Sequence, residues 1–144
     1  MNKKQGRILV CIFLGLILPL AVYSDARGIF RTLSRAVASQ VSKIHIRKLE
    51  KKYKNQRISG FAYFLAITED DSGNPIANLS TESDSSSPTS VGLIIFLKRH
   101  SARHRKLKRG DPVHLNATFE EIRMRSIIAI GGIITKVKSK SKRD

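Results

Sequence analysis

The residues best suited to chemistry in this chain are seven cations that fall within twelve positions of the sequence. No acid interrupts them, and they are Lys98, Arg99, Arg103, Arg105, Lys106, Lys108 and Arg109. Closely spaced Lys and Arg side chains attract phosphate and carboxylate groups, and a run without acids keeps that field uncompensated. The pattern predicts a polyanion-binding segment, although a solvated surface segment has the same composition. Nucleic acid, anionic lipid and an acidic protein partner are all open as ligands.

Aromatic side chains are the second ingredient of a nucleic-acid surface, because bases stack on them. The chain has no Trp, and Phe61, Tyr63 and Phe64 fall together in one apolar stretch. Small cores rely on aromatic residues, so core packing is the expected role for most of them. We expect Tyr63 to face outward, since its hydroxyl needs water or a polar partner. Tyr63 therefore joins the candidate polyanion site.

The sequence contains few residue patterns that are typical of metal or catalytic sites. His100 and His104 have the spacing of two metal ligands on a helix, but cations surround them and no Cys, Asp or Glu is near in sequence. Cys11 is the only cysteine, which excludes an internal disulfide and a Cys-based metal site. No Ser-His-Asp arrangement, phosphate-binding loop or dinucleotide glycine pattern is visible. We predict a binding protein without metal, cofactor or small-molecule substrate, not an enzyme.

The chain as a whole is strongly basic. In its 144 residues, 27 Lys and Arg oppose 11 Asp and Glu, which gives a formal net charge of +16. This length predicts one domain with an N-terminal appendage, and 41% hydrophobic residues suffice for a modest core. The charge indicates an anionic partner but does not choose among nucleic acid, lipid head groups and acidic glycans.

The first 24 residues are typical of a targeting segment. Three cations, the last of them Arg7, precede a run from Ile8 to Tyr23 without charge. Two interpretations fit this segment: a secretory signal peptide cleaved after Ser24 and an uncleaved membrane anchor. The uncharged run is at the short limit for a spanning helix, so its length does not decide between them. A buried core helix is the third interpretation. Either of the first two places the rest of the chain outside the cytoplasm, exported or anchored in the inner membrane.

Residues 25–54 are predicted to be an amphipathic basic connector, helical from Gly28 to about Lys54. Its apolar residues recur at three- and four-residue spacing, and they are Ile29, Leu33, Val37, Val41 and Ile44. This stripe fits a helix packed on the following domain, a basic helix lying on an anionic membrane or a short coiled coil.

Residues 55–138 have the pattern of a small, mainly β, five-stranded barrel. In one run, Val113, Leu115, Ala117 and Phe119 alternate with polar residues, as in a half-buried strand. A short helix at 101–107 separates the third strand from the fourth. The expected strands are 57–68, 76–79, 91–97, 113–119 and 127–137.

Glycines and polar runs indicate the irregular points of this barrel. Gly60 predicts a bulge or sharp bend in the first strand, and Gly131-Gly132 a bulge or turn in the last apolar run. Gly110-Asp111-Pro112 is a turn. Residues 80–90 are predicted to be a mobile polar loop, and residues 139–144 a basic tail.

Three stretches carry a resemblance to a known family. They are Lys52-Tyr-Lys-Asn-Gln-Arg-Ile-Ser-Gly60, the segment from Ile67 to Leu79 with its Gly-Asn-Pro turn, and Leu107-Lys-Arg-Gly-Asp-Pro-Val113. Over about residues 51–138 the chain resembles the bacterial OB-fold family of the tRNA-anticodon-binding-like type. The resemblance implies an OB-like barrel, often placed behind a membrane anchor or signal. The long polar loop, and Ala117 where a glycine is usual, depart from that family's pattern.

These patterns together predict a non-enzymatic, extracytoplasmic OB-like domain. Its ligand would be a polyanion, either nucleic acid or an anionic lipid or glycan, or else a protein partner. The alternative is a structural subunit of a bacterial envelope assembly, such as a secretion or conjugation apparatus. The first function predicts an affinity that falls steeply with salt. The second predicts weak, nonspecific nucleic-acid binding and retention in a membrane complex.

Overall fold

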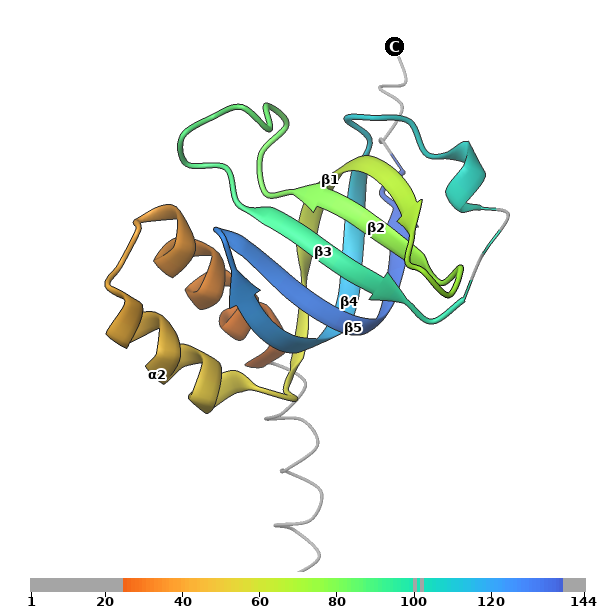
Figure 1. Cartoon of the computed structure of the whole chain (residues 1–144). Helices are drawn as coiled ribbons and strands as arrows, with labels where there is room; N and C mark the ends of the chain where they lie inside the picture. Colours follow the sequence, from red (N-terminus) through yellow and green to blue (C-terminus); the bar gives the residue numbers. More distant parts are fainter. Residues whose placement is uncertain (1–24, 100, 102, 139–144) are drawn as a thin grey trace, which may run out of the picture.

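The described residues form a closed five-stranded β-barrel with two helices against one end (Figure 1). The computed structural model describes residues 25–99, 101 and 103–138. The predicted targeting segment 1–24 and basic tail 139–144 lie outside these residues. Within the part of the chain that is described, no helix has the length and apolar character needed to cross a membrane.

The five predicted strands are confirmed, and their order defines the fold. The barrel runs β1-β2-β3-β5-β4 and closes by pairing β4 with β1; only the β3–β5 pair is parallel. A five-stranded barrel of this kind is the architecture of an OB-like domain. The strands are β1 Arg57–Glu69, β2 Pro75–Ser80, β3 Gly92–Leu97, β4 Pro112–Arg123 and β5 Ser126–Lys136.

Alternation along the strands builds the core, as β4 shows. Val113, Leu115, Ala117 and Phe119 are all buried, at 2% exposure or less. The polar residues between them point outward and are half-buried. Successive side chains of a strand face opposite sides of the sheet, so the period of two in the sequence sets which residues fill the barrel.

Gly60 does not introduce a bulge, which was one of the two predicted alternatives at this position. β1 pairs with β4 without interruption from Arg57 to Tyr63, and the irregularity of β1 lies between Phe64 and Ala66. Gly60 instead permits a close approach, because a side chain at this position would overlap the ring of Phe30.

The Gly131-Gly132 pair does form a bulge. Ile130 pairs with Thr118 and Ile133 with Asn116, so the two glycines of β5 share one partner position on β4. Gly131 has a φ of +60°, in the left-handed region that favours glycine. β5 continues through the bulge as a single strand, so the last apolar run is not divided.

The predicted single helix of the connector is wrong. Residues 25–38 are helical and α2 spans Lys43–Tyr53, with a break between them. At the end of the first helix the Val41 N–H donates to Ala36 O at 3.3 Å, and the Gln40 N–H donates to Val37 O at 3.2 Å. Gln40 has a φ of +51°, so these two bonds form a Schellman-type helix end.

The break reverses the chain and divides the apolar stripe. Ile29, Leu33 and Val37 are buried against the barrel, whereas Ile44 is 69% exposed. Ser42 caps α2 by accepting a hydrogen bond from the His45 N–H at 3.3 Å. Of the three interpretations of the connector, packing on the barrel is therefore the one that the buried residues bear out.

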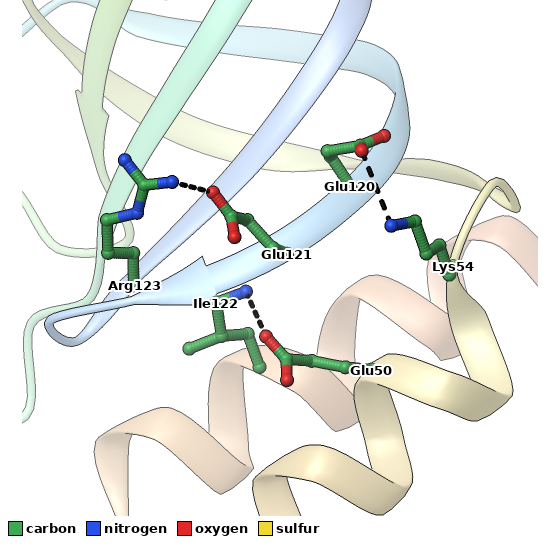
Figure 2. Close-up of polar contacts among 6 residues, drawn as sticks. All are labelled: Glu50, Lys54, Glu120, Glu121, Ile122 and Arg123. Atoms are coloured by element: carbon green, nitrogen blue, oxygen red, sulfur yellow. Dashed lines mark hydrogen bonds and ion pairs between the residues drawn. The ribbon is translucent and has the colours of Figure 1, made fainter.

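Polar contacts join α2 to the C-terminal end of β4 (Figure 2). The Glu50 side chain accepts a hydrogen bond from the backbone N–H of Ile122 at 2.8 Å. The Lys54 ammonium lies 3.6 Å from a carboxylate oxygen of Glu120. These contacts, with the buried stripe of residues 25–38, fix the helices against one end of the barrel.

Two connections lie beside the barrel. Residues 98–111 link β3 to β4 and contain one short 3-10 helix, η1 (His104–Lys106), where a short helix was predicted. The polar loop between β2 and β3 is closed at its base by hydrogen bonds between Thr81 and Val91, both at 3.0 Å. The mobility expected for this loop from its composition stays a prediction.

Candidate polyanion-binding surface

The seven predicted cations all lie on the connection of residues 98–111, and all are exposed. Lys98 and Arg99 follow the end of β3, and the others lie in or beside η1 and in the turn before β4. In that turn the Asp111 N–H donates to Lys108 O at 2.9 Å, and Gly110 has a φ of +88°. The connection thus carries all seven cations on one segment, and this segment lies away from the two helices (Figure 1).

The cations of the connection form no ion pair with the acids of the described chain. Among the ion pairs between described residues, none involves any of the seven. Arg109 donates a long hydrogen bond of 3.4 Å to Ser85 Oγ, which brings the polar loop beside the connection. Like charges held close together repel one another, so an anion that lies across them is favoured and displaces counterions.

The basic residues of the β4–β5 turn are engaged in contacts of their own. The Arg123 guanidinium pairs with the Glu121 carboxylate (Figure 2). The Arg125 guanidinium donates to the carbonyl of Pro88 in the polar loop. These contacts leave the turn a weaker candidate for anion binding than the connection.

Lys136, near the C-terminus of the described chain, is also paired. Its ammonium lies 2.8 Å from Asp111 Oδ2, and that oxygen also accepts the backbone N–H of Lys108 at 2.9 Å. The hydrogen bond from Lys136, followed by that from Lys108, holds the pKa of Asp111 below its ordinary value of 3.8. Asp111 thus stabilises the turn that presents Lys108 and Arg109.

Tyr63 faces outward as predicted but is half-buried, and Phe61 is the aromatic residue that the sequence analysis missed. Phe61 is 60% exposed, whereas Phe64 is buried. Sequence reasoning assigned Phe61 to core packing. The signal was present in the period of two, because Ile58, Ala62 and Phe64 are the inward set and Phe61 shares the outward face with Tyr63.

The imidazole of His114 lies against Phe61 on this outward face. The two ring centroids are 5.2 Å apart at an interplanar angle of 68°, an edge-to-face contact. His114 Nε2 lies 3.1 Å from Ser59 Oγ, within hydrogen-bond distance. Burial, and secondly the positive charge of Arg27, lower the pKa of His114 from its ordinary value of 6.5. The imidazole is therefore neutral at neutral pH.

A groove of about 540 Å³ lies on the other side of the barrel, over β3, β5 and the end of β4. The outer side of the second and third strands is where OB folds bind oligonucleotides, and this groove adjoins it. Its charged lining residues are Glu120, Glu121 and Arg123, and both carboxylates are in ion pairs, Glu120 with Lys54 and Glu121 with Arg123. Its apolar lining is Ile94, Phe96, Met124, Ile128 and Ile130.

The structure provides no metal centre in the ranges it describes. Across residues 25–99, 101 and 103–138, no three His, Cys, Asp or Glu side chains are grouped to hold a metal ion. His100, one of the two histidines with helical spacing, lies outside those residues.

Comparisons with known proteins give a likeness of fold only. No protein-family model matches the chain, and no curated protein sequence matches it. The tRNA-anticodon-binding-like type is therefore not confirmed, and that resemblance stays a prediction. The OB-like assignment rests on the strand order described above.

Solved structures similar to this chain include the following three. A lipoprotein of Klebsiella pneumoniae to which nucleic-acid binding is ascribed has 10% identity and a TM-score of 0.48, over 65% of this chain and 81% of that one. Schizosaccharomyces pombe Pot1pC bound to single-stranded DNA has 17% identity and a TM-score of 0.43, over 62% and 84%. Fission yeast Pot1 with single-stranded DNA has 18% identity and a TM-score of 0.41, over 62% and 38%. These values carry no argument about what this protein binds.

Proposed function

We propose that this protein is a non-enzymatic OB-like binding domain whose ligand is a polyanion, with nucleic acid as the first candidate. The observation that carries the proposal is the connection of residues 98–111. Its seven exposed cations include no member of an ion pair among the described residues. A net charge of +16 adds a long-range field that steers an anionic chain toward the molecule.

The proposed binding is electrostatic in its first step. Each cation that contacts a phosphate releases a condensed counterion, so the affinity falls linearly with salt on a logarithmic scale. For a single strand the slope is about −0.7 for each phosphate neutralised. Five cations in contact with the strand would therefore contribute about 3.5 to the magnitude of that slope.

The test is a titration of the protein with a labelled single-stranded oligonucleotide at several salt concentrations. The variant replaces the five cations in and after η1 with Ala, and these are Arg103, Arg105, Lys106, Lys108 and Arg109. A matched control removes five exposed cations from the two helices, namely Arg31, Arg35, Lys43, Arg47 and Lys48. Both variants lose the same charge, so only the position of the charge differs.

We expect the connection variant to lose most of its affinity and of its salt slope, and the helix variant to keep most of both. Equal losses in the two variants would show that net charge alone drives binding and would overturn the assignment of the surface. Anionic liposomes form a parallel arm. Binding of liposomes without any binding of oligonucleotide would replace nucleic acid by a lipid surface as the polyanion.

A second candidate function is a structural subunit of an envelope assembly. A groove of about 480 Å³ between the helices and the β4–β5 turn favours it, since its lining includes Val37, Val41 and Ile122. Met124 at the edge of this groove is 94% exposed. Such a groove suits a protein partner, and recovery of the protein in a stable membrane complex after detergent extraction would support this function over the first.

We also propose that the domain acts outside the cytoplasm, exported or anchored in the inner membrane. The support is the basic start and uncharged run of residues 1–24. A fusion of alkaline phosphatase to the C-terminus tests this location, because that enzyme matures only in an oxidising compartment. An inactive fusion beside an active cytoplasmic reporter fusion would contradict it.

A further inference from the structure

The outward side of the β1–β4 pair carries both aromatic and polar side chains. From Arg57 to Tyr63, β1 pairs in register with β4 from Thr118 back to Pro112. We call their outward side chains the β1–β4 face. Its members are Arg57, Ser59, Phe61 and Tyr63 on β1, and Pro112, His114, Asn116 and Thr118 on β4.

Phe61 is the prominent residue of this face. A phenylalanine that is 60% exposed in the middle of a strand leaves much of its apolar surface in water, and that part gains nothing from burial. The ring is nevertheless held in place, because Phe61 packs edge-to-face on His114, and His114 lies within hydrogen-bond distance of Ser59. A fixed exposed ring is pre-organised to stack on a planar partner.

The face contains no acid and is flanked by cations. Arg57 closes one end, where its guanidinium donates to the Asn116 side chain at 2.7 Å. Arg27 is near enough for its charge to act on His114. At the other end Tyr63 pairs with Pro112, directly after the turn that carries the last cations of the connection. Between this face and those cations lies Asp111, whose carboxylate is paired with Lys136.

The spacing of the two aromatic residues favours unpaired bases. Phe61 and Tyr63 are two positions apart on one strand, so their side chains leave the sheet about 6.6 Å apart. Stacked bases in a duplex strand are about 3.4 Å apart. Two neighbouring bases that stack on Phe61 and on Tyr63 therefore cannot also stack on each other. Bases are separated in this way when single strands bind to aromatic platforms.

The groove beside β3 and β5 is less suitable. It borders the surface used by other OB folds, and its charged lining residues are Glu120, Glu121 and Arg123. Glu121 pairs with Arg123, the one cation of this lining, and Glu120 pairs with Lys54, so the lining offers no unpaired cation to a phosphate group. The charges of this chain therefore favour the opposite side of the barrel.

We propose that the β1–β4 face is a base-stacking surface for single-stranded nucleic acid, with Phe61 as the main platform and Tyr63 as the second. This inference rests on the proposed function, because the cations of the connection would hold the phosphates of the same strand. Ser59, His114 and Asn116 are the polar groups within reach of the base edges. The strand would cross β1 and β4 instead of the usual second and third strands.

The experiment measures binding of the full chain to a short oligothymidylate and to an abasic strand of the same length. Phe61→Ala is the test variant, and Phe61→Tyr is the conservative variant that keeps the ring. Ile44→Ala is the matched control, since Ile44 is an exposed apolar residue on α2. Thermal melting of each variant checks the fold, and the exposure of Phe61 predicts little change.

We expect Phe61→Ala to weaken oligothymidylate binding about tenfold, without changing the salt slope, because stacking is lost and no charge is removed. Phe61→Tyr and Ile44→Ala should bind as the wild type does. On the abasic strand Phe61→Ala should equal the wild type. Photocrosslinking with a 5-bromouracil strand should give adducts at Phe61 or Tyr63 and none at Phe96.

The contrary results show which of the two proposals fails. If Phe61→Ala binds oligothymidylate as the wild type does while the connection variant loses affinity, the stacking surface is wrong and the polyanion function stands. An equal loss on the abasic strand would also exclude stacking, since no base is present. If the wild type binds neither strand, both the stacking surface and the nucleic-acid ligand are wrong.

Discussion

The ring of Phe30 occupies the space that a side chain at Gly60 would need. Phe30 belongs to the helix of residues 25–38, and Gly60 lies inside β1, so this contact joins a helix to the barrel wall. Both residues are buried. A glycine in the middle of a strand weakens that strand, and here the loss is compensated by the close approach of an aromatic ring.

Replacement of Gly60 by Ala should destabilise the protein, because the added methyl group overlaps Phe30. Overpacking of a core typically costs about 1 to 3 kcal/mol in the free energy of unfolding. Urea unfolding followed by circular dichroism measures this change. Gly28→Ala is the matched control, since its methyl group meets only Asp25 at 3.6 Å and Ala is the better helix former. A Gly60→Ala variant as stable as Gly28→Ala would refute the role given to Phe30.

Glu50 should matter for stability through the single hydrogen bond that it accepts from β4 (Figure 2). Glu50→Ala removes the acceptor of the Ile122 N–H and should cost about 1 to 3 kcal/mol. Glu50→Gln keeps an acceptor oxygen and should lose clearly less. The measurement is again urea unfolding, with hydrogen exchange at Ile122 as a local probe. Equal losses for the two variants would show that packing of the side chain, not the hydrogen bond, is responsible.

Stability should fall as the solution is acidified below the ordinary pKa of histidine, in part because of His114. Its folded-state pKa lies below the unfolded value of 6.5, so the unfolded chain binds the proton first. The loss therefore begins as the pH drops through about 6.5 and levels off below the folded-state pKa. Unfolding free energies across this pH range measure it.

The matched variant for this pH effect is His114→Gln, which keeps polar atoms near Ser59. It should depend less on pH than the wild type over the same range. A direct check is the chemical shift of the His114 ring during an NMR titration. A midpoint at or above the ordinary value would contradict the burial that the structure gives this ring.

The strands were predictable because their pattern is local. Apolar and polar residues alternate in the fourth strand, where the apolar ones are Val113, Leu115, Ala117 and Phe119. Such an alternation can be recognised from neighbouring residues alone. The irregularity at Gly131-Gly132 was predictable in the same way from two adjacent residues, although the sequence left a bulge and a turn as alternatives. The break after residue 38 was missed because no glycine or proline lies there, and Gln40 takes the left-handed conformation that usually indicates glycine.

By itself the sequence determined the basic character of the protein, the five strands and the position of the seven cations along one connection, since composition and period are properties of the chain alone. Only the tertiary structure decided the surface around them. It placed Phe61 in solvent instead of in the core and set His114 beside it. It also showed that the glycine at position 60 makes room for the ring of Phe30 and does not form a bulge. These facts depend on which residues of different strands and helices meet. The physical cause is barrel closure: pairing β4 with β1 turns one side of β1 outward and leaves Phe30 to fill the space beside Gly60.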